Sequence, residues 1–204
     1  MSASADDDDE TGDPRTVAAL ADAAALTGAP CRRCSRALCG HEAVYCLVLG
    51  YKGAPHCLPC IAAHMGEALA PLRERGFEYV RHHDCFLTAW RHAGDLEGHA
   101  GVDRPPCVFA LDEDPAAAAQ AGAGRDAVAE AQPSGHASWD AGGMGCGDLV
   151  LELRQRLAKL PPRGLLHLIA TDPGAPTDLP AWCSMTGHTL ESAEHPDYRI
   201  RRRP

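Results

Sequence analysis

Aromatic side chains are scarce in this sequence and make up 5% of its 204 residues. Because large aromatic side chains supply much of the buried area of a protein core, their scarcity predicts small cores. At roughly 100 to 200 residues per domain, the length allows one or two domains. Two small domains are therefore favoured over one large domain.

Long apolar runs are also lacking. No stretch approaches the ~20 apolar residues of a membrane-spanning helix, and the chain starts with an acidic tract rather than a basic and apolar leader. The formal net charge is −9, and four of the last six residues are arginine, so no general nucleic-acid-binding surface is indicated. We therefore expect a cytoplasmic protein that binds neither membranes nor nucleic acid directly.

Several common catalytic motifs are missing. The sequence has no phosphate-binding glycine loop, no His-Glu-x-x-His helix and no serine elbow. What it has instead is ten cysteines. Without an export signal, cysteines are more often metal ligands or reactive thiols than disulfides, so we expect thiol chemistry or metal binding.

Composition divides the chain into four segments. Residues 1–14 are acidic and are expected to form a disordered tail, whereas residues 15–104 form a module that holds seven of the ten cysteines. Residues 105–136 are rich in alanine and glycine, as a linker is, and regular apolar periodicity resumes in residues 137–204. We therefore expect two small domains joined by a linker.

Two cysteine pairs stand out in the first module, Cys31-Arg-Arg-Cys34 and Cys57-Leu-Pro-Cys60, with 22 residues between them. Two such turns can place four thiolates around one metal at about 2.3 Å. Four thiolates close the coordination sphere, so the spacing predicts a structural Zn²⁺ site. An iron–sulfur cluster and free or redox-active thiols are the alternatives.

The predicted secondary structure around these pairs is a helix over residues 15–28, a hairpin that includes residues 44–51, and a helix whose apolar face runs from Ile61 to Leu72. The first turn of that last helix would supply Cys57 and Cys60. This order of knuckle, hairpin and helix resembles a treble-clef zinc finger in architecture only.

Other cysteines and histidines of this module are weaker candidates. Four further residues could form a second metal site, although their spacing shows no clear pair of ligands. They are Cys39, His41, Cys46 and His64. The run His82-His83-Asp84-Cys85 could lower the pKa of the Cys85 thiol and make it a sulfur acceptor, although a packed cysteine on a helix is favoured. Cys107 stands alone, and we assign it no role.

Residues 137–204 alternate between strand and helix patterns. A short strand precedes a helix with leucines at 149, 153, 157 and 160, followed by a strand at 165–170, a helix at 178–186 and strands at 188–194 and 198–202. The fold class is therefore α/β (α+β). It consists of a two-layer β-α-β-α-β-β sandwich with both helices on one sheet face, preceded by a small cysteine-rich, zinc-finger-like α+β module.

Several ordered motifs in this segment carry a family resemblance. They are DAGGMGCGD at 140–148, ATDP at 170–173, DLPAW at 178–182 and GHTL at 187–190. Together they resemble the TusA family of small sulfur carriers over about residues 137–204, a third of the chain. The resemblance implies that Cys146 carries sulfur as a persulfide, taken from a cysteine desulfurase or rhodanese-like donor and passed to an acceptor protein.

The residues around Cys146 support and complicate this role. A thiol in the first turn of a helix faces unpaired N–H groups and the positive end of the helix dipole, which favour thiolate and persulfide anions. The family follows its cysteine with a proline, one further residue and a second proline, where this chain has Gly147, Asp148 and Leu149. Gly147 loosens the turn, and the Asp148 carboxylate opposes the thiolate. Cys183, within the second helix, is interpreted as a packed side chain.

Three functions remain open on the sequence. The leading one is sulfur transfer through Cys146, a sulfurtransferase activity in which the zinc module docks a partner. The alternatives are a zinc-binding interaction or regulatory protein with an inert TusA-like module, and a thiol–disulfide redox protein that uses Cys57 and Cys60. Sulfur loading of Cys146 separates the first from the others.

Overall fold

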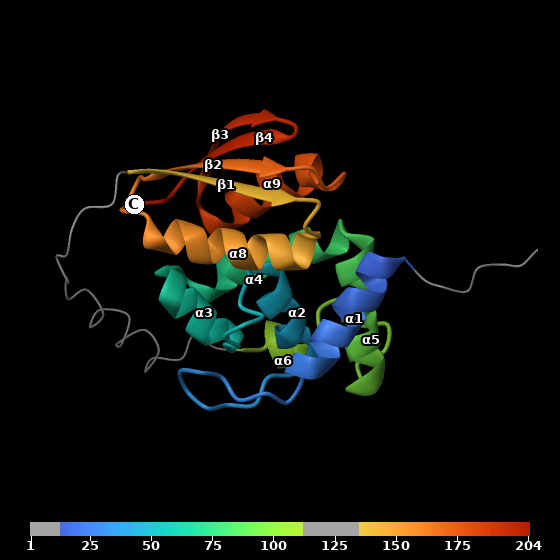
Figure 1. Ribbon diagram of the computed structural model, residues 1–204. Helices are drawn as coiled ribbons and strands as arrows, with labels where there is room; N and C mark the ends of the chain where they lie inside the picture. Colours follow the sequence, from blue (N-terminus) through green and yellow to red (C-terminus); the bar gives the residue numbers. More distant parts are fainter. Residues whose placement is uncertain (1–12, 112–134) are drawn as a thin grey trace, which may run out of the picture.

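The computed structural model describes residues 13–111 and 135–204. Almost all of the expected acidic tail and most of the expected linker lie outside these residues. The described part is a group of helices followed by a four-stranded sheet with two further helices (Figure 1).

The amino-terminal segment is helical, and its helices are α1 (Pro14–Leu26), α2 (Gly40–Val48), α3 (Leu58–Met65), α4 (Leu69–Arg81), α5 (Asp84–Leu96) and α6 (Pro106–Phe109). The helix expected at 15–28 is confirmed as α1. It begins where the Asp13 side chain accepts a hydrogen bond from the Thr16 amide, and Gly28 follows it at φ 79°.

The hairpin expected at 44–51 is wrong, because residues 40–48 form α2. The helix is started by a capping box in which Cys39 and Glu42 each accept from the other's backbone amide. Every residue of α2 is buried. Its sequence therefore shows no alternation of apolar and polar residues from which a helix could be told from a strand. The treble-clef architecture, which needs that hairpin, is therefore not present in the described residues.

The single helix expected from Ile61 to Leu72 is divided into α3 and α4. Gly66 ends α3 in the left-handed conformation at φ 67°, where a glycine carries no steric penalty. Ile61 and Leu72 are nevertheless both fully buried. The two short helices thus bury the same apolar positions that one helix was expected to bury.

The carboxy-terminal segment has the expected order β-α-β-α-β-β, made by β1 (His136–Gly142), α8 (Cys146–Lys159), β2 (Leu165–Ala170), α9 (Ala175–Thr186), β3 (Thr189–Glu194) and β4 (Asp197–Arg201). The sheet order is β1-β2-β4-β3, with β1 parallel to β2 and the other neighbours antiparallel.

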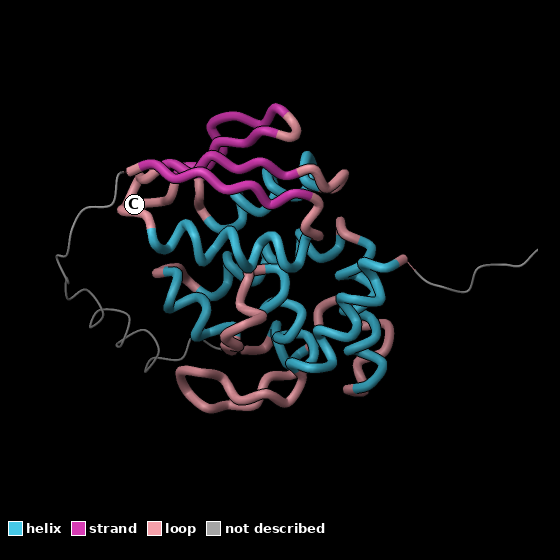
Figure 2. The backbone as a smooth tube through the Cα atoms, in the orientation of Figure 1, coloured by secondary structure: helices cyan, strands magenta, loops and turns pink. Residues whose placement is uncertain are grey.

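One face of this sheet is buried. Alternate residues of β2 are buried, and so are Tyr198 and Ile200 of β4. Helices α8 and α9 both lie on this face, as Figure 2 shows. The four leucines predicted from their spacing are all buried, which confirms the buried face of α8. They are Leu149, Leu153 and Leu157 within the helix and Leu160 directly after it.

The helical segment packs against the opposite side of α8 (Figure 1). At Gly50 the approach is so close that a Cβ would lie 2.8 Å from the Val150 carbonyl oxygen. The Arg154 Nε donates to the Gly50 carbonyl at 2.5 Å, and its guanidinium lies 4.1 Å from the centre of the Tyr51 ring. The buried apolar side chains of the two segments form one contiguous cluster.

Among the described residues, no helix combines the length and apolar character needed to cross a membrane.

Candidate functional site

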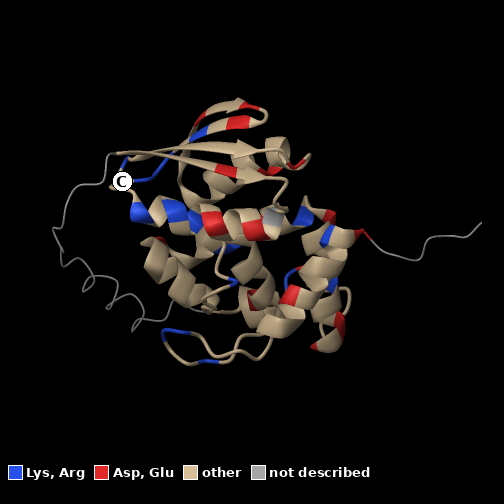
Figure 3. Cartoon of the chain, viewed as in Figure 1, with Lys and Arg blue, Asp and Glu red and all other residues tan. Residues whose placement is uncertain are grey.

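The backbone places Cys146 where the sequence predicts it. Helix α8 begins at Cys146, directly after Gly145, which has no side chain to cap the helix. The first amides of a helix lack intrahelical partners, so this turn is a favourable place for an anion. Asp148 lies in the same turn and Lys159 in the last turn, and Figure 3 shows basic residues gathered at that carboxyl end.

A lysine from the other segment reaches this turn. The Lys52 ammonium lies 3.1 Å from Asp148 Oδ1 and 2.7 Å from Asp22 Oδ2 of α1. The hydrogen bond to Asp22 is the main cause of a raised pKa of Lys52, with Asp148 contributing. The charge of Asp148, which the sequence sets against a thiolate at Cys146, is thus partly balanced by a cation 96 residues away in sequence.

A cavity of about 220 Å³ adjoins the first turn of α8. Its walls come from α1, from the start of α5 and from the residues that flank Cys146, and they include Arg15, Ala18, Cys85, Phe86, Gly145 and Gly147. The amino-terminal segment therefore forms part of the surface beside Cys146. A partner that reaches this turn would meet both segments.

Cys85 lines this cavity, and the alternative in which the neighbouring histidines activate its thiol is not supported. His82 faces Glu78 at 2.9 Å, and both ring nitrogens of His83 have other partners, the Tyr79 carbonyl at 2.7 Å and Asp178 at 2.8 Å. Burial raises the pKa of the Cys85 thiol. The favoured interpretation of a packed cysteine fits this environment.

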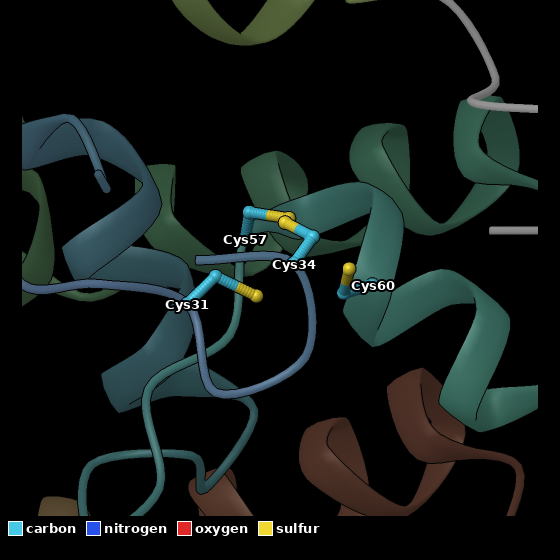
Figure 4. A group of neighbouring side chains, drawn as sticks. All are labelled: Cys31, Cys34, Cys57 and Cys60. Atoms are coloured by element: carbon cyan, nitrogen blue, oxygen red, sulfur yellow. The ribbon is translucent and has the colours of Figure 1, made fainter. Parts of the chain in front are cut away.

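The four cysteines of the two predicted pairs converge, with all their sulfur atoms within 4.8 Å of one another. Cys31 and Cys34 lie on the turn after α1, Cys57 immediately precedes α3, and Cys60 lies in its first turn. Figure 4 shows the Cys34 and Cys57 sulfurs beside each other and near those of Cys31 and Cys60. The Cys34 and Cys57 sulfurs are 3.5 Å apart.

This cluster fits a tetrahedral metal. Four thiolates at about 2.3 Å from one ion stand about 3.8 Å apart, within the observed spacing. Burial acts to raise the pKa of Cys31, but backbone hydrogen bonds at Cys34, Cys57 and Arg33 outweigh it and lower this pKa to about 6. Burial raises the pKa of Cys57 to about 11. Binding a metal would therefore release protons from the cluster.

Sequence reasoning missed Glu42, which organises this region. Its fully buried side chain accepts from the Leu58 amide at the start of α3 at 2.9 Å and pairs with Arg36 at 2.5 Å. Arg36 in turn hydrogen-bonds to Cys57. The available signal was the capping-box spacing from Cys39 to Glu42.

The weaker set of possible ligands is not brought together. Cys46 contacts the His56 carbonyl at 3.2 Å, and His64 Nδ1 lies 2.6 Å from the Tyr51 hydroxyl. Cys39 and His41 instead lie together with Glu97 and Cys107, two residues that the sequence did not connect with them. Cys183 is buried in α9 and burial raises its pKa to about 12, as expected for a packed thiol.

Comparisons with known proteins concern the carboxy-terminal segment. The family model described as "Sulfurtransferase TusA" matches residues 138–203. Three proteins named "Sulfur carrier protein TusA" are similar to this chain. That of Pseudomonas syringae pv. tomato is 47% identical over 57 residues, 27% of this chain and 68% of the relative.

The second relative, from Pseudomonas savastanoi pv. phaseolicola, is 42% identical over 69 residues, 32% of this chain and 82% of the relative. The third, from Pseudomonas fluorescens, is 45% identical over 51 residues, 25% of this chain and 61% of the relative. The family model covers none of residues 1–137.

Proposed function

The chain belongs to the TusA family of sulfur carriers, and on this basis we propose that it carries sulfane sulfur as a persulfide on Cys146. The observation that carries the proposal is that Cys146, the only cysteine in the matched segment apart from the buried Cys183, is the first residue of α8.

The proposed reaction is a transfer between thiols without net oxidation. The Cys146 thiolate attacks the outer sulfur of a persulfide on the donor, a sulfur–sulfur bond forms at Cys146, and the donor's sulfur–sulfur bond breaks. The donor leaves as a thiolate. An acceptor thiolate then attacks the outer sulfur on Cys146 in the same way.

The surroundings of Cys146 support this chemistry. The open amides of the first turn favour the anionic thiolate and persulfide, and Lys52 counters the carboxylate of Asp148. The adjoining cavity is lined by Gly145 and Gly147, the two residues that flank Cys146 in the chain.

We propose that the amino-terminal module is a docking element held by a structural zinc at Cys31, Cys34, Cys57 and Cys60. In support, α1 and α5 border the cavity at the start of α8, so a partner approaching Cys146 touches this module. The partners we expect are a cysteine desulfurase or rhodanese-like donor and an acceptor protein in the cytoplasm.

The deciding experiment is sulfur loading of the full chain. After incubation with a cysteine desulfurase and cysteine, or with a small sulfane-sulfur donor, intact-mass spectrometry should find one added sulfur, and peptide mapping should place it on Cys146. The Cys146→Ser variant should gain none. Cys183→Ser is the matched control and should load normally, because its thiol is buried.

Two other outcomes have clear meanings. Sulfur on Cys85 instead of Cys146 would keep the transfer function but change the carrier residue. If several donors leave the wild type unmodified, the carrier proposal fails and an interaction protein becomes the better account.

A further inference from the structure

We propose that Cys39, His41, Glu97 and Cys107 form a second zinc site, independent of the sulfur-carrier function. One ligand atom from each residue lies within 4.8 Å of all the others, which outside the four-cysteine cluster occurs only here among the described residues. The donors come from the start of α2, the end of α5 and α6.

The distances match tetrahedral coordination. His41 Nδ1 lies 3.2 Å from Glu97 Oε2 and 3.3 Å from Cys107 Sγ. Ligands bound to Zn²⁺ at about 2.0 to 2.3 Å stand roughly 3.3 to 3.8 Å apart. The site therefore needs only small shifts to close around an ion.

Hydrogen bonding alone leaves this group poorly satisfied. A neutral imidazole carries a proton on only one of its two nitrogens, so Nδ1 can donate to either Glu97 or Cys107 but not to both. Nε2 of the fully buried His41 has no hydrogen-bond partner among the described residues, so Nδ1 is the ring nitrogen that faces Glu97 and Cys107. A cation among the four ligand atoms would satisfy the carboxylate, the sulfurs and Nδ1 together.

Glu97 also has a structural role that is compatible with metal binding. Its Oε1 accepts a hydrogen bond from the Gly40 amide at 2.5 Å, at the start of α2. This bond holds the carboxylate in place and leaves Oε2 directed toward His41. Such support of a ligand by a backbone group is common around protein metal sites.

The packing of α2 against α5 explains how residues distant in sequence meet. A Cβ at Gly40 would lie 2.8 Å from the Ala93 Cβ, so the absence of a side chain lets the two helices approach closely. The edge-on contact of His41 with Trp90, at 4.6 Å between ring centres, fixes the imidazole. The donors are thus held by the folded core.

The donor types select the metal. Two thiolates, one imidazole and one carboxylate suit Zn²⁺, which accepts sulfur, nitrogen and oxygen in a tetrahedron. Their combined charge of about −3 would fall to about −1 with the ion bound. All four positions are filled by protein, so the zinc would be structural and would join α2, α5 and α6.

The test is the metal content of full-length variants purified under reducing conditions. Elemental analysis of the wild type should give about two zinc ions per chain, one for each cluster. Cys107→Ser and Glu97→Gln should each lower this to about one, and Cys60→Ser should do the same by emptying the other cluster. Cys85→Ser, a half-buried cysteine on α5, is the matched control and should keep both.

Glu97→Gln separates metal loss from misfolding, because the amide oxygen of glutamine can still accept from Gly40. Its far-ultraviolet circular dichroism should match that of the wild type. Cobalt substitution gives a second measurement. Subtracting the spectrum of Glu97→Gln from that of the wild type should leave the visible bands of one tetrahedral cobalt ion. These bands should indicate fewer thiolate ligands than the four-cysteine site has. The proposal would be overturned if the wild type held one zinc and Cys60→Ser held none. It would also be overturned if Cys107→Ser and Glu97→Gln kept the metal content of the wild type.

Discussion

At the residue scale, the charges around Cys146 come from both segments of the chain. Lys52 bridges Asp22 and Asp148, so one ammonium group joins α1 to the first turn of α8. Asp148 is 64% exposed, and an exposed pair of this kind contributes at most about 1 kcal/mol. Its effect should appear in the reactivity of Cys146 rather than in the stability of the fold.

The first prediction is that Lys52→Met slows the alkylation of Cys146 by iodoacetamide at neutral pH by about twofold to fivefold. Removing the ammonium leaves the Asp148 carboxylate unbalanced in the helical turn that begins at Cys146. Asp148→Asn should have the opposite effect and speed alkylation. Peptide mass spectrometry measures both rates, and Arg91→Met, on an exposed part of α5, serves as the control. An unchanged rate in Lys52→Met would show that Cys146 does not sense this charge.

At the element scale, the start of α8 and the middle of α4 show what a glycine does in a helix. A Cβ at Gly147 would have no atom within 4 Å, whereas a Cβ at Gly76 would overlap the ring of Tyr45. The first glycine loosens a helix, and the second permits α4 to pack on α2. The same substitution should therefore have opposite effects at the two positions.

The second prediction is that Gly147→Ala raises the free energy of unfolding by about 0.5 to 1 kcal/mol, because alanine loses less backbone entropy in a helix. Gly76→Ala should lower it by about 1 to 3 kcal/mol through the clash with Tyr45. Urea denaturation of the two variants checks this pair. Destabilisation by Gly147→Ala would mean that the first turn needs the freedom of glycine.

At the scale of the whole molecule, the two segments make one packed body in the described residues. Their apolar side chains form a single cluster, and polar contacts bridge them at Arg154–Gly50, His83–Asp178 and Arg15–Asp172. The expectation that residues 15–104 and 137–204 are separate domains stays a prediction. Their association can be tested without the segment that connects them.

The third prediction is that the segments stay together after the chain is cut. A protease site inserted within residues 112–134 should yield two fragments that elute as one species in size-exclusion chromatography, because the interface is apolar and closely packed. Arg154→Ala, which removes the Gly50 hydrogen bond and the contact with Tyr51, should weaken this association. Fragments of the wild type that separate at once would contradict it.

The fourth prediction concerns the pH dependence of stability. Burial lowers the pKa of His83, but hydrogen bonds to Asp178 and to the Tyr79 carbonyl outweigh it and raise the pKa above its ordinary value. The folded state therefore binds the proton more tightly than the unfolded state does. The resulting stabilisation is full below about pH 6.5 and is lost as pH rises through the raised pKa.

The measurement is urea unfolding at about pH 6 and pH 8.5 for the wild type and His83→Gln. The wild type should lose on the order of 1 kcal/mol more than the variant over this range. His82→Gln is the matched control, because His82 is exposed on the same helix end and its ring faces nearby Glu78. Identical pH dependence in the wild type and His83→Gln would contradict the prediction.

The sequence by itself determined the parts of this protein that depend on local patterns. Leucine spacing fixes the buried face of α8, and the strand and helix patterns of residues 137–204 predict their order along the chain, because these periods follow from backbone geometry. The spacing of Cys31–Cys34 and Cys57–Cys60 likewise predicts their cluster, since each pair sits on one short turn. The start of α8 at Cys146 was implied by the resemblance to the TusA family and not by these periods.

Only the tertiary structure decided the features that depend on distant residues. A fully buried apolar run has no polar face, so its period does not distinguish a helix from a strand, and the packing around residues 44–48 decided that they form a helix. Lys52 meets Asp148, and Cys39 and His41 meet Glu97 and Cys107, because helix packing closes long loops that no local spacing encodes. The second group of metal-binding residues therefore exists only in the folded chain.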